Sequence, residues 1–176
     1  ANDALKRLFP RFDDADHKGW EIAANRARQG DDSPLQAVGW KGATEDHAVC
    51  KEILALIGAG KEGRHILAHF QKSPFGWDKD SVHGALVCLC ASGQLLASDT
   101  RTGEILAAKQ LDHQRIAKAS FRTESVNLTA KDKIAIKGLF QTAGVIFKPD
   151  DDLNQKAGEY IGKVLDYARA AGGDAP

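Results

Sequence analysis

Residues 77–108 read WDKDSVHGALVCLCASGQLLASDTRTGEILAA and carry the clearest structural signals of the chain. Asp78 suits the N-cap position of a helix, and Trp77 and Val82 hold the N′ and N4 positions of a hydrophobic staple. The apolar spacing predicts that this helix buries one stripe, formed by Val82, Ala85, Leu86 and Leu89. After Gly93, two strand-like runs, QLLASD and EILAA, flank the turn residues TRTG, a pattern that predicts a β-hairpin.

Two further helices are expected just before this stretch. The segment TEDHAVCKEILALIGAG, residues 44–60, has apolar residues at helical spacing, and KEGRHILAHFQ, residues 61–71, predicts a second, shorter helix. The run KSPFGW must turn, because Pro74 restricts the backbone of Ser73 and a glycine follows. Three helices, a tight turn and a hairpin follow the order of a winged helix-turn-helix. The predicted fold is therefore mainly α with a small β-hairpin, a winged helix-turn-helix core with flanking helices.

The flanking segments are predicted to be helical. Residues 1–43 form an N-terminal helical segment, with a helix in DADHKGWEIAANRARQG capped by Asp14 or Asp16 and ended by Gly30. Residues 44–112 are the winged-helix domain, and residues 113–176 a C-terminal helical extension that packs on it as one compact unit. Within that extension FRTESVNL predicts a strand and Thr129 begins a helix in a capping-box-like pattern with Asp132. The apolar stripe of that helix is expected to be Ile134, Ile136, Leu139 and Phe140.

The bulk composition excludes some classes of protein. Lys plus Arg is 24 and Asp plus Glu is 24, so the net charge is zero and nucleic-acid binding would need a local basic patch. Three cysteines, an odd count, and no secretion signal indicate a reducing cytoplasm and buried thiols. No apolar run approaches the roughly 20 residues of a membrane span. The absence of Met fits removal of a first Met before Ala1, or a piece excised from a longer protein, which we favour.

The run IGAGKEGRHI, residues 57–66, raises the possibility of a phosphate-binding loop. A P-loop needs a Gly, four residues, and then Gly-Lys followed by Ser or Thr, after a strand. Here Ala55 holds the place of the first Gly, Glu62 follows Lys61, and the run follows a predicted helix. A carboxylate at the place of the magnesium-binding hydroxyl would repel phosphate. We therefore interpret the run as a helix end and a linker.

No other group of residues predicts catalysis. His65 and His69 lie at i and i+4 on one helix, but the sequence places no third metal ligand beside them. The Asp runs at 13–16 and 150–152 are interpreted as helix caps, and no nucleophile-elbow pattern surrounds a serine. We predict no catalytic, cofactor-binding or metal-binding residue in this chain, and no enzyme activity of its own.

DNA binding without base reading is the function that the charges favour. In the third predicted helix Lys79 stands between Asp78 and Asp80, and the helix lacks the Arg, Asn and Gln side chains that read base edges. Phosphate contacts are expected instead from cations before the helix and in the hairpin. These residues are Lys61, Arg64, Lys72, Lys79, Arg101 and Lys109, followed by Arg115, Lys118 and Arg122. Two alternatives stay open: solvated surface charges, or a third helix that packs through Val87 on a protein partner.

Several stretches of the sequence resemble a known protein family. The runs LFPRFDDADHKGW, HAVCKEIL, IGAGKEG and HFQKSPFGWDKD, with IAKASFRTESVNLT and IKGLFQTAGV further on, look like the large P-loop ATPase of bacterial BREX bacteriophage-exclusion systems, the BrxC/PglY type. The resemblance extends from about Leu8 to about Val145 and is most specific around HFQKSPFGW. The nucleotide-binding motifs of that family are missing here, so no catalytic residue is carried over.

The resemblance implies a biological context. It implies an accessory region towards the C-terminal side of such an ATPase, with ATP bound elsewhere in the parent protein. It also implies a cytoplasmic phage-defence (antiviral) complex that acts on DNA and contains other BREX subunits. We expect a non-catalytic winged-helix module that engages double-stranded DNA without strong sequence specificity. The alternative is a protein-interaction module that assembles the BREX complex.

Overall fold

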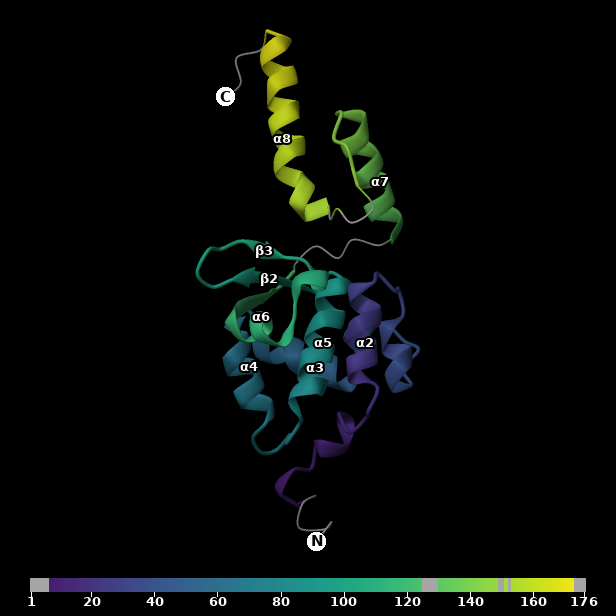
Figure 1. Ribbon diagram of the computed structural model, residues 1–176, viewed down its shortest axis with the longest axis vertical. Helices are drawn as coiled ribbons and strands as arrows, with labels where there is room; N and C mark the ends of the chain where they lie inside the picture. The colour runs from purple at the N-terminus through teal and green to yellow at the C-terminus, as the bar shows by residue number, and fades with distance from the viewer. Residues whose placement is uncertain (1–6, 125–129, 149–150, 152, 173–176) are drawn as a thin grey trace. The chain divides into compact units, whose positions relative to one another are not determined.

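The computed structural model describes residues 7–124, 130–148, 151 and 153–172, and these form two compact units. The first unit is Ala1–Ser125 and the second is Val126–Pro176. The described residues are mainly helical and contain one small four-stranded antiparallel sheet (Figure 1). The coarse prediction of a mainly α chain with a β-hairpin is confirmed.

The first unit is built around one buried helix, α5, at Lys79–Ala91. The predicted cap is confirmed, since the Asp78 carboxylate accepts a hydrogen bond of 2.7 Å from the Ser81 backbone N–H. The predicted one-sided stripe is wrong, because every residue from Ser81 to Leu89 is buried. Helices α2 (Trp20–Arg28), α3 (Ala48–Ile57) and α4 (Gly63–Phe70) all pack against α5. A helix covered on several sides has no exposed face to offer to another molecule.

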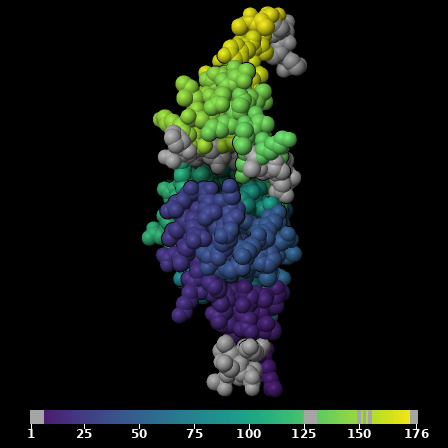
Figure 2. All heavy atoms as spheres, turned by 90° about the vertical axis from the view of Figure 1, so that its right-hand side faces the viewer, coloured from purple at the N-terminus to yellow at the C-terminus, as the bar shows by residue number. Residues whose placement is uncertain are grey.

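Helix α2 covers one side of α5, and this contact requires a glycine. A Cβ atom on Gly84 would lie 2.7 Å from the Trp20 carbonyl oxygen, so the two helices can approach closely only at glycine. Figure 2 shows the N-terminal segments, in purple and blue, forming one side of this unit. The predicted caps of α2 are wrong. Gly19 is its N-cap, and the Asp14 carboxylate instead accepts a hydrogen bond of 2.7 Å from the Arg11 guanidinium.

The turn between α4 and α5 holds an aromatic cluster. The Trp77 ring is 1% exposed and stacks on Phe70 at 4.7 Å between ring centroids. Its indole N–H donates a hydrogen bond of 2.7 Å to the Arg11 carbonyl oxygen. The predicted turn is confirmed, and it ties the N-terminal segment to the core.

The sheet has the strand order β1-β4-β2-β3. Strands β2 (Leu95–Asp99) and β3 (Ile105–Leu106) form the predicted hairpin. Strand β4 (Ala119–Thr123) runs antiparallel between β2 and β1 (Lys61–Glu62), and helix α6 (His113–Lys118) precedes it. Part of the predicted strand at 121–128 is thus present, while residues 125–128 lie outside the described residues. Residues 113–124 belong to the first unit, whereas the sequence assigned them to the C-terminal extension.

The second unit consists of α7 (Ala130–Thr142) and α8 (Leu153–Ala170). Phe140 of α7 is buried and stacks on Tyr160 of α8 at 4.3 Å between ring centroids. The rest of the predicted stripe is not buried, since Ile134 is 73% exposed and Leu139 is 55% exposed. The predicted cap Thr129 lies outside the described residues. Short 3-10 helices complete the described elements, at Phe12–Asp14, Pro34–Val38, Thr44–Asp46 and Ala108–Gln110.

The run IGAGKEGRHI ends a helix, as predicted. Helix α3 ends at Ile57, and Gly58 and Gly60 take positive φ angles of 48° and 155° before β1 begins. The prediction of buried thiols is confirmed for Cys50 and Cys88, whereas Cys90 is only partly buried. Burial raises the pKa of the Cys88 thiol to about 12. Among the described residues, no helix is both long and apolar enough to cross a membrane.

Candidate nucleic-acid interface

The six predicted phosphate-binding residues do not form one patch. Lys72 follows α4 and Lys79 begins α5, so both lie at the loop that joins these helices. Figure 1 shows this loop at the opposite end of the first unit from the β2–β3 hairpin, which carries Arg101. Lys109 lies in the 3-10 helix that packs on α2 and α5. Only Lys61, Arg64 and Arg101 lie in or beside the sheet.

Helix α5 cannot lie in a groove of DNA. Its residues from Ser81 to Leu89 are enclosed by α2, α3 and α4, so only its first turn and its last residues are accessible. The alternative that Val87 contacts a protein partner is wrong for the same reason, since Val87 is fully buried. Any interface of the first unit must therefore use another element.

One face of the sheet is open, and its residues follow from the strand register. In β2 and β4 the buried residues alternate with partly or fully exposed ones. Among the residues that are not buried, the strand register pairs Ser98 with Ser120 and Leu96 with Arg122. Glu62 of β1 and Ile105 of β3 extend the serine row at its two ends. We call this set the outer sheet face: Glu62, Leu96, Ser98, Ile105, Ser120 and Arg122.

Arginines lie on and beside the outer sheet face. Arg122 is exposed and stands in the central strand. Arg64, in the first turn of α4, reaches Glu62 with 2.6 Å between Nε and Oε2, and its side chain is 66% exposed. An exposed arginine in such a pair keeps free N–H groups, because a guanidinium has five donors. The pair with Glu62 positions Arg64 beside the outer sheet face.

The hairpin turn is held by Asp99. Its carboxylate accepts hydrogen bonds from the backbone N–H groups of Thr102 and Arg101, at 3.0 Å and 2.8 Å. These two bonds lower the pKa of Asp99. At the base of the turn, the Thr100 hydroxyl donates a bond of 2.8 Å to the Lys118 carbonyl oxygen. The turn is thus fixed from inside, and the Arg101 side chain is exposed at its tip.

The sequence missed the two serines of this surface. Ser98 and Ser120 lie 22 positions apart, and only the pairing of β2 with β4 makes them neighbours. Arg122 was recognised as a cation, but its partner strand was not. The alternation in ASFRT was the available signal, and it indicates which side chains share a face without naming the neighbouring strand.

Comparison with protein-family models, with curated proteins and with solved structures finds no match for this chain.

Proposed function

We propose that the first unit is a non-catalytic winged-helix module that holds duplex DNA by its phosphates. The element order supports this proposal: α3, β1, α4, α5 and the β2–β3 hairpin follow the order of a winged helix-turn-helix. Two departures set the mode of binding. Strand β4 separates β1 from the hairpin, and α2 covers the helix that usually enters the major groove. Contact would thus be made by the sheet and the hairpin.

The observation that carries the proposal is the register of β4. It brings exposed Arg122 and the partly exposed Ser98 and Ser120 onto one face of the sheet, with Arg64 beside it and Arg101 on the attached hairpin. Arginine forks and hydroxyl groups are common ligands of phosphate oxygens. The outer sheet face has no aromatic side chain on which bases could stack, which favours a duplex over a single strand.

The expected binding is weak and independent of base sequence. Three arginines that each neutralise one phosphate give a slope of about −3 for log K against log salt. Under the resemblance to BREX ATPases, such a module would hold DNA near an ATPase core located elsewhere in a cytoplasmic defence complex. High affinity is not needed from a module that is tethered to other DNA-binding parts.

Binding of a labelled 20-base-pair duplex of arbitrary sequence, measured by fluorescence anisotropy between low and physiological salt, tests the proposal. We expect Arg101→Glu with Arg122→Glu to abolish binding at low salt. The matched control is Lys72→Glu with Lys79→Glu, which reverses the same number of charges at the far end of α5. The control should reduce affinity only slightly. Equal losses in the two double variants, or a loss only in the control, would remove the outer sheet face from the proposal.

A second candidate function, assembly with other proteins, is favoured by the second unit. Its two helices leave large apolar side chains exposed, among them Ile134, Leu139, Ile161, Val164, Leu165 and Tyr167. Exposed apolar residues in this number are typical of interaction surfaces. If the wild-type chain binds no duplex even at the lowest salt, the DNA proposal fails and this candidate takes its place.

A further inference from the structure

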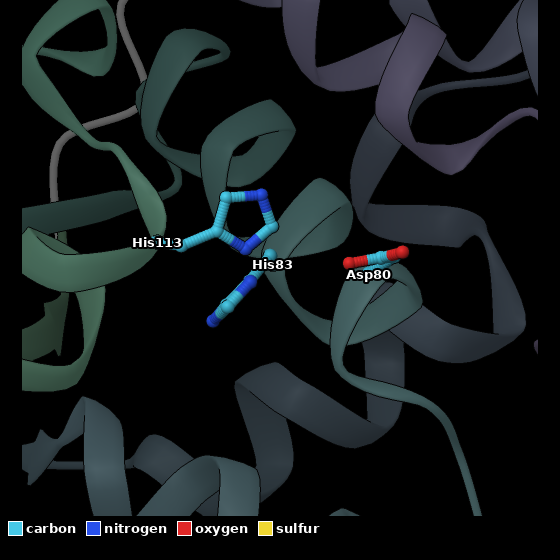
Figure 3. A group of neighbouring side chains, drawn as sticks. All are labelled: Asp80, His83 and His113. Carbon is cyan, nitrogen blue, oxygen red and sulfur yellow. The ribbon is translucent and has the colours of Figure 1, made fainter.

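A cluster of three potential ligands lies away from the outer sheet face. Asp80 and His83 stand three residues apart on α5, and His113 is the first residue of α6 (Figure 3). Each offers one ligand atom, and these atoms lie within 4.8 Å of one another. No sequence pattern joins them, because His113 is 30 positions from His83.

His83 is the unusual member of the cluster. It is only 5% exposed, and neither of its ring nitrogens has a hydrogen-bond partner among the described residues. Its ring meets that of His113 edge-on, with 4.3 Å between centroids. Nearly all buried polar groups in folded proteins have a hydrogen-bond partner, so a histidine without one calls for a specific explanation. Coordination of a metal ion would satisfy one nitrogen directly.

The His83 ring is held in a fixed position, because the residues on both sides of it in α5 are buried. It can therefore serve as the anchor of a site that the two exposed side chains complete.

The charges around the cluster are mixed. Among the described residues, Asp80 supplies the carboxylate of the cluster, and Lys79 lies beside it in sequence. The Arg28 guanidinium is turned to the Leu111 carbonyl oxygen, to which it donates bonds of 2.8 Å and 3.1 Å. The Asp112 carboxylate is engaged as the N-cap of α6. Lys79 and Arg28 would repel a metal cation at the cluster. The negative charge of the Asp80 carboxylate offsets this repulsion, so Asp80 is an essential ligand of such a site.

We propose that Asp80, His83 and His113 bind one divalent transition-metal ion, with Zn²⁺ as the preferred species. Two imidazoles and one carboxylate are a common donor set for such ions and leave a fourth position open to water or an external ligand. Tetrahedral zinc holds its donor atoms roughly 3.4 Å apart, as bonds of about 2.0–2.1 Å require. Asp80 and His113 are both exposed, so rotation of their side chains can close the remaining distance on the fixed His83.

The test uses the full chain after removal of bound metal with a chelator. Zn²⁺ is titrated in competition with a chromophoric chelator, and Co²⁺ is added separately to record the d–d absorption of the bound ion. We expect one Zn²⁺ per chain and a tetrahedral Co²⁺ spectrum. Asp80→Asn and His113→Gln should each weaken Zn²⁺ binding by at least about tenfold, because each removes a direct ligand.

The matched control removes two other histidines. His65 and His69 are exposed on α4 at i and i+4 and are an independent candidate for weak surface binding. The double variant His65→Gln with His69→Gln should keep the affinity and the Co²⁺ spectrum of the wild type. His83 is left intact in these variants, because its substitution can unfold the core.

Two results would overturn the proposal. One is an absence of stoichiometric Zn²⁺ binding in the wild-type chain. The other is binding that survives in Asp80→Asn and His113→Gln but is lost when His65 and His69 are replaced. A rise of the thermal midpoint with Zn²⁺ in the wild type, and no rise in His113→Gln, would support the proposal through folding alone.

Discussion

Two indole N–H groups fix the N-terminal segment on the core of the first unit. Trp20 donates to the Ala15 carbonyl oxygen at 2.8 Å, and Trp77 donates to the Arg11 carbonyl oxygen at 2.7 Å. Both rings are almost completely buried. Each tryptophan therefore contributes both a large apolar surface and one hydrogen bond. A smaller apolar residue cannot supply both.

Replacement of Trp77 by Ala is expected to lower the free energy of unfolding by about 3–5 kcal/mol. The change removes the stacking on Phe70 and leaves a cavity beneath the α4–α5 turn. Urea unfolding followed by circular dichroism measures the effect. Trp77→Phe is the control, since it keeps an aromatic ring beside Phe70 but loses the bond to Arg11, at about 1–3 kcal/mol, together with part of the buried ring. Equal losses in both variants would mean that the stacking contributes nothing.

His47 makes the stability of the first unit depend on pH. It is the N-cap of α3, and its Nδ1 accepts a bond of 3.2 Å from the Val49 backbone N–H. Burial lowers its pKa below the usual 6.5. The unfolded chain thus takes up the proton first as the pH falls. This contribution to stability is complete above about pH 6.5 and is lost as the pH falls through the folded-state pKa.

We expect the free energy of unfolding of the wild type to fall between pH 7 and pH 5, and to fall less in His47→Asn. Asparagine keeps an N-cap acceptor that does not titrate. Buried His83 contributes in the same pH range in both proteins, so its effect cancels in the comparison. Identical pH profiles for the two proteins would show that the cap at His47 does not titrate with folding.

At the scale of elements, helix packing in the first unit depends on one close approach. Gly84 of α5 faces the backbone of Trp20 in α2, where a Cβ would meet the carbonyl oxygen at 2.7 Å. Backbone atoms cannot move aside as the end of a side chain can. By contrast, a Cβ at Gly138 of α7 would meet nothing within 4 Å.

Gly84→Ala and Gly138→Ala are the same chemical change in two helices, and we expect opposite effects. The first should destabilise the chain by about 1–3 kcal/mol, since it separates α2 from α5. The second should stabilise α7 by about 0.5–1 kcal/mol, because Ala has the higher helix propensity. Thermal unfolding of both variants measures this. A stabilised Gly84→Ala would disprove the close contact between α2 and α5.

At the scale of the whole molecule, the core belongs to the first unit. All residues of the main hydrophobic cluster lie between Ala15 and Phe121, and strand β4 near the end of this range is central in the sheet. The second unit has few buried residues of its own among those described, chiefly Phe140 and Val145. The chain thus divides after the sheet is complete.

Residues 1–125 are therefore expected to fold without the rest of the chain, with an unfolding midpoint in urea close to that of the full chain. Residues 1–112, which end at the boundary predicted from the sequence, should not fold cooperatively. They lack β4, the strand that pairs with both β1 and β2. A folded 1–112 piece would restore the sequence-based boundary.

Local sequence signals predicted most helices of the first unit. The Asp78 cap, the turn at KSPFGW and the ends of α3 and α5 at Gly58 and Gly93 all depend on residues within a few positions of one another. The α2 cap failed because the helix begins only at Trp20, after a turn, so neither Asp14 nor Asp16 directly precedes its first residue. The predicted buried stripe of α7 was wrong, because apolar spacing shows only that a helix face could be buried. It does not show that another element covers that face.

Most helices and the hairpin of the first unit can be placed from the sequence, because caps, glycines and apolar spacing act over a few residues. Which of these elements are buried, and which side chains meet, depends on contacts between distant parts of the chain. Burial of α5 depends on α2, some 60 positions earlier, and the outer sheet face depends on the insertion of β4 between β1 and β2. The cluster of Asp80, His83 and His113 likewise arises where α6 returns to α5. Long-range pairing is set by the competition of many weak contacts in the folded chain, and no single stretch of sequence encodes it.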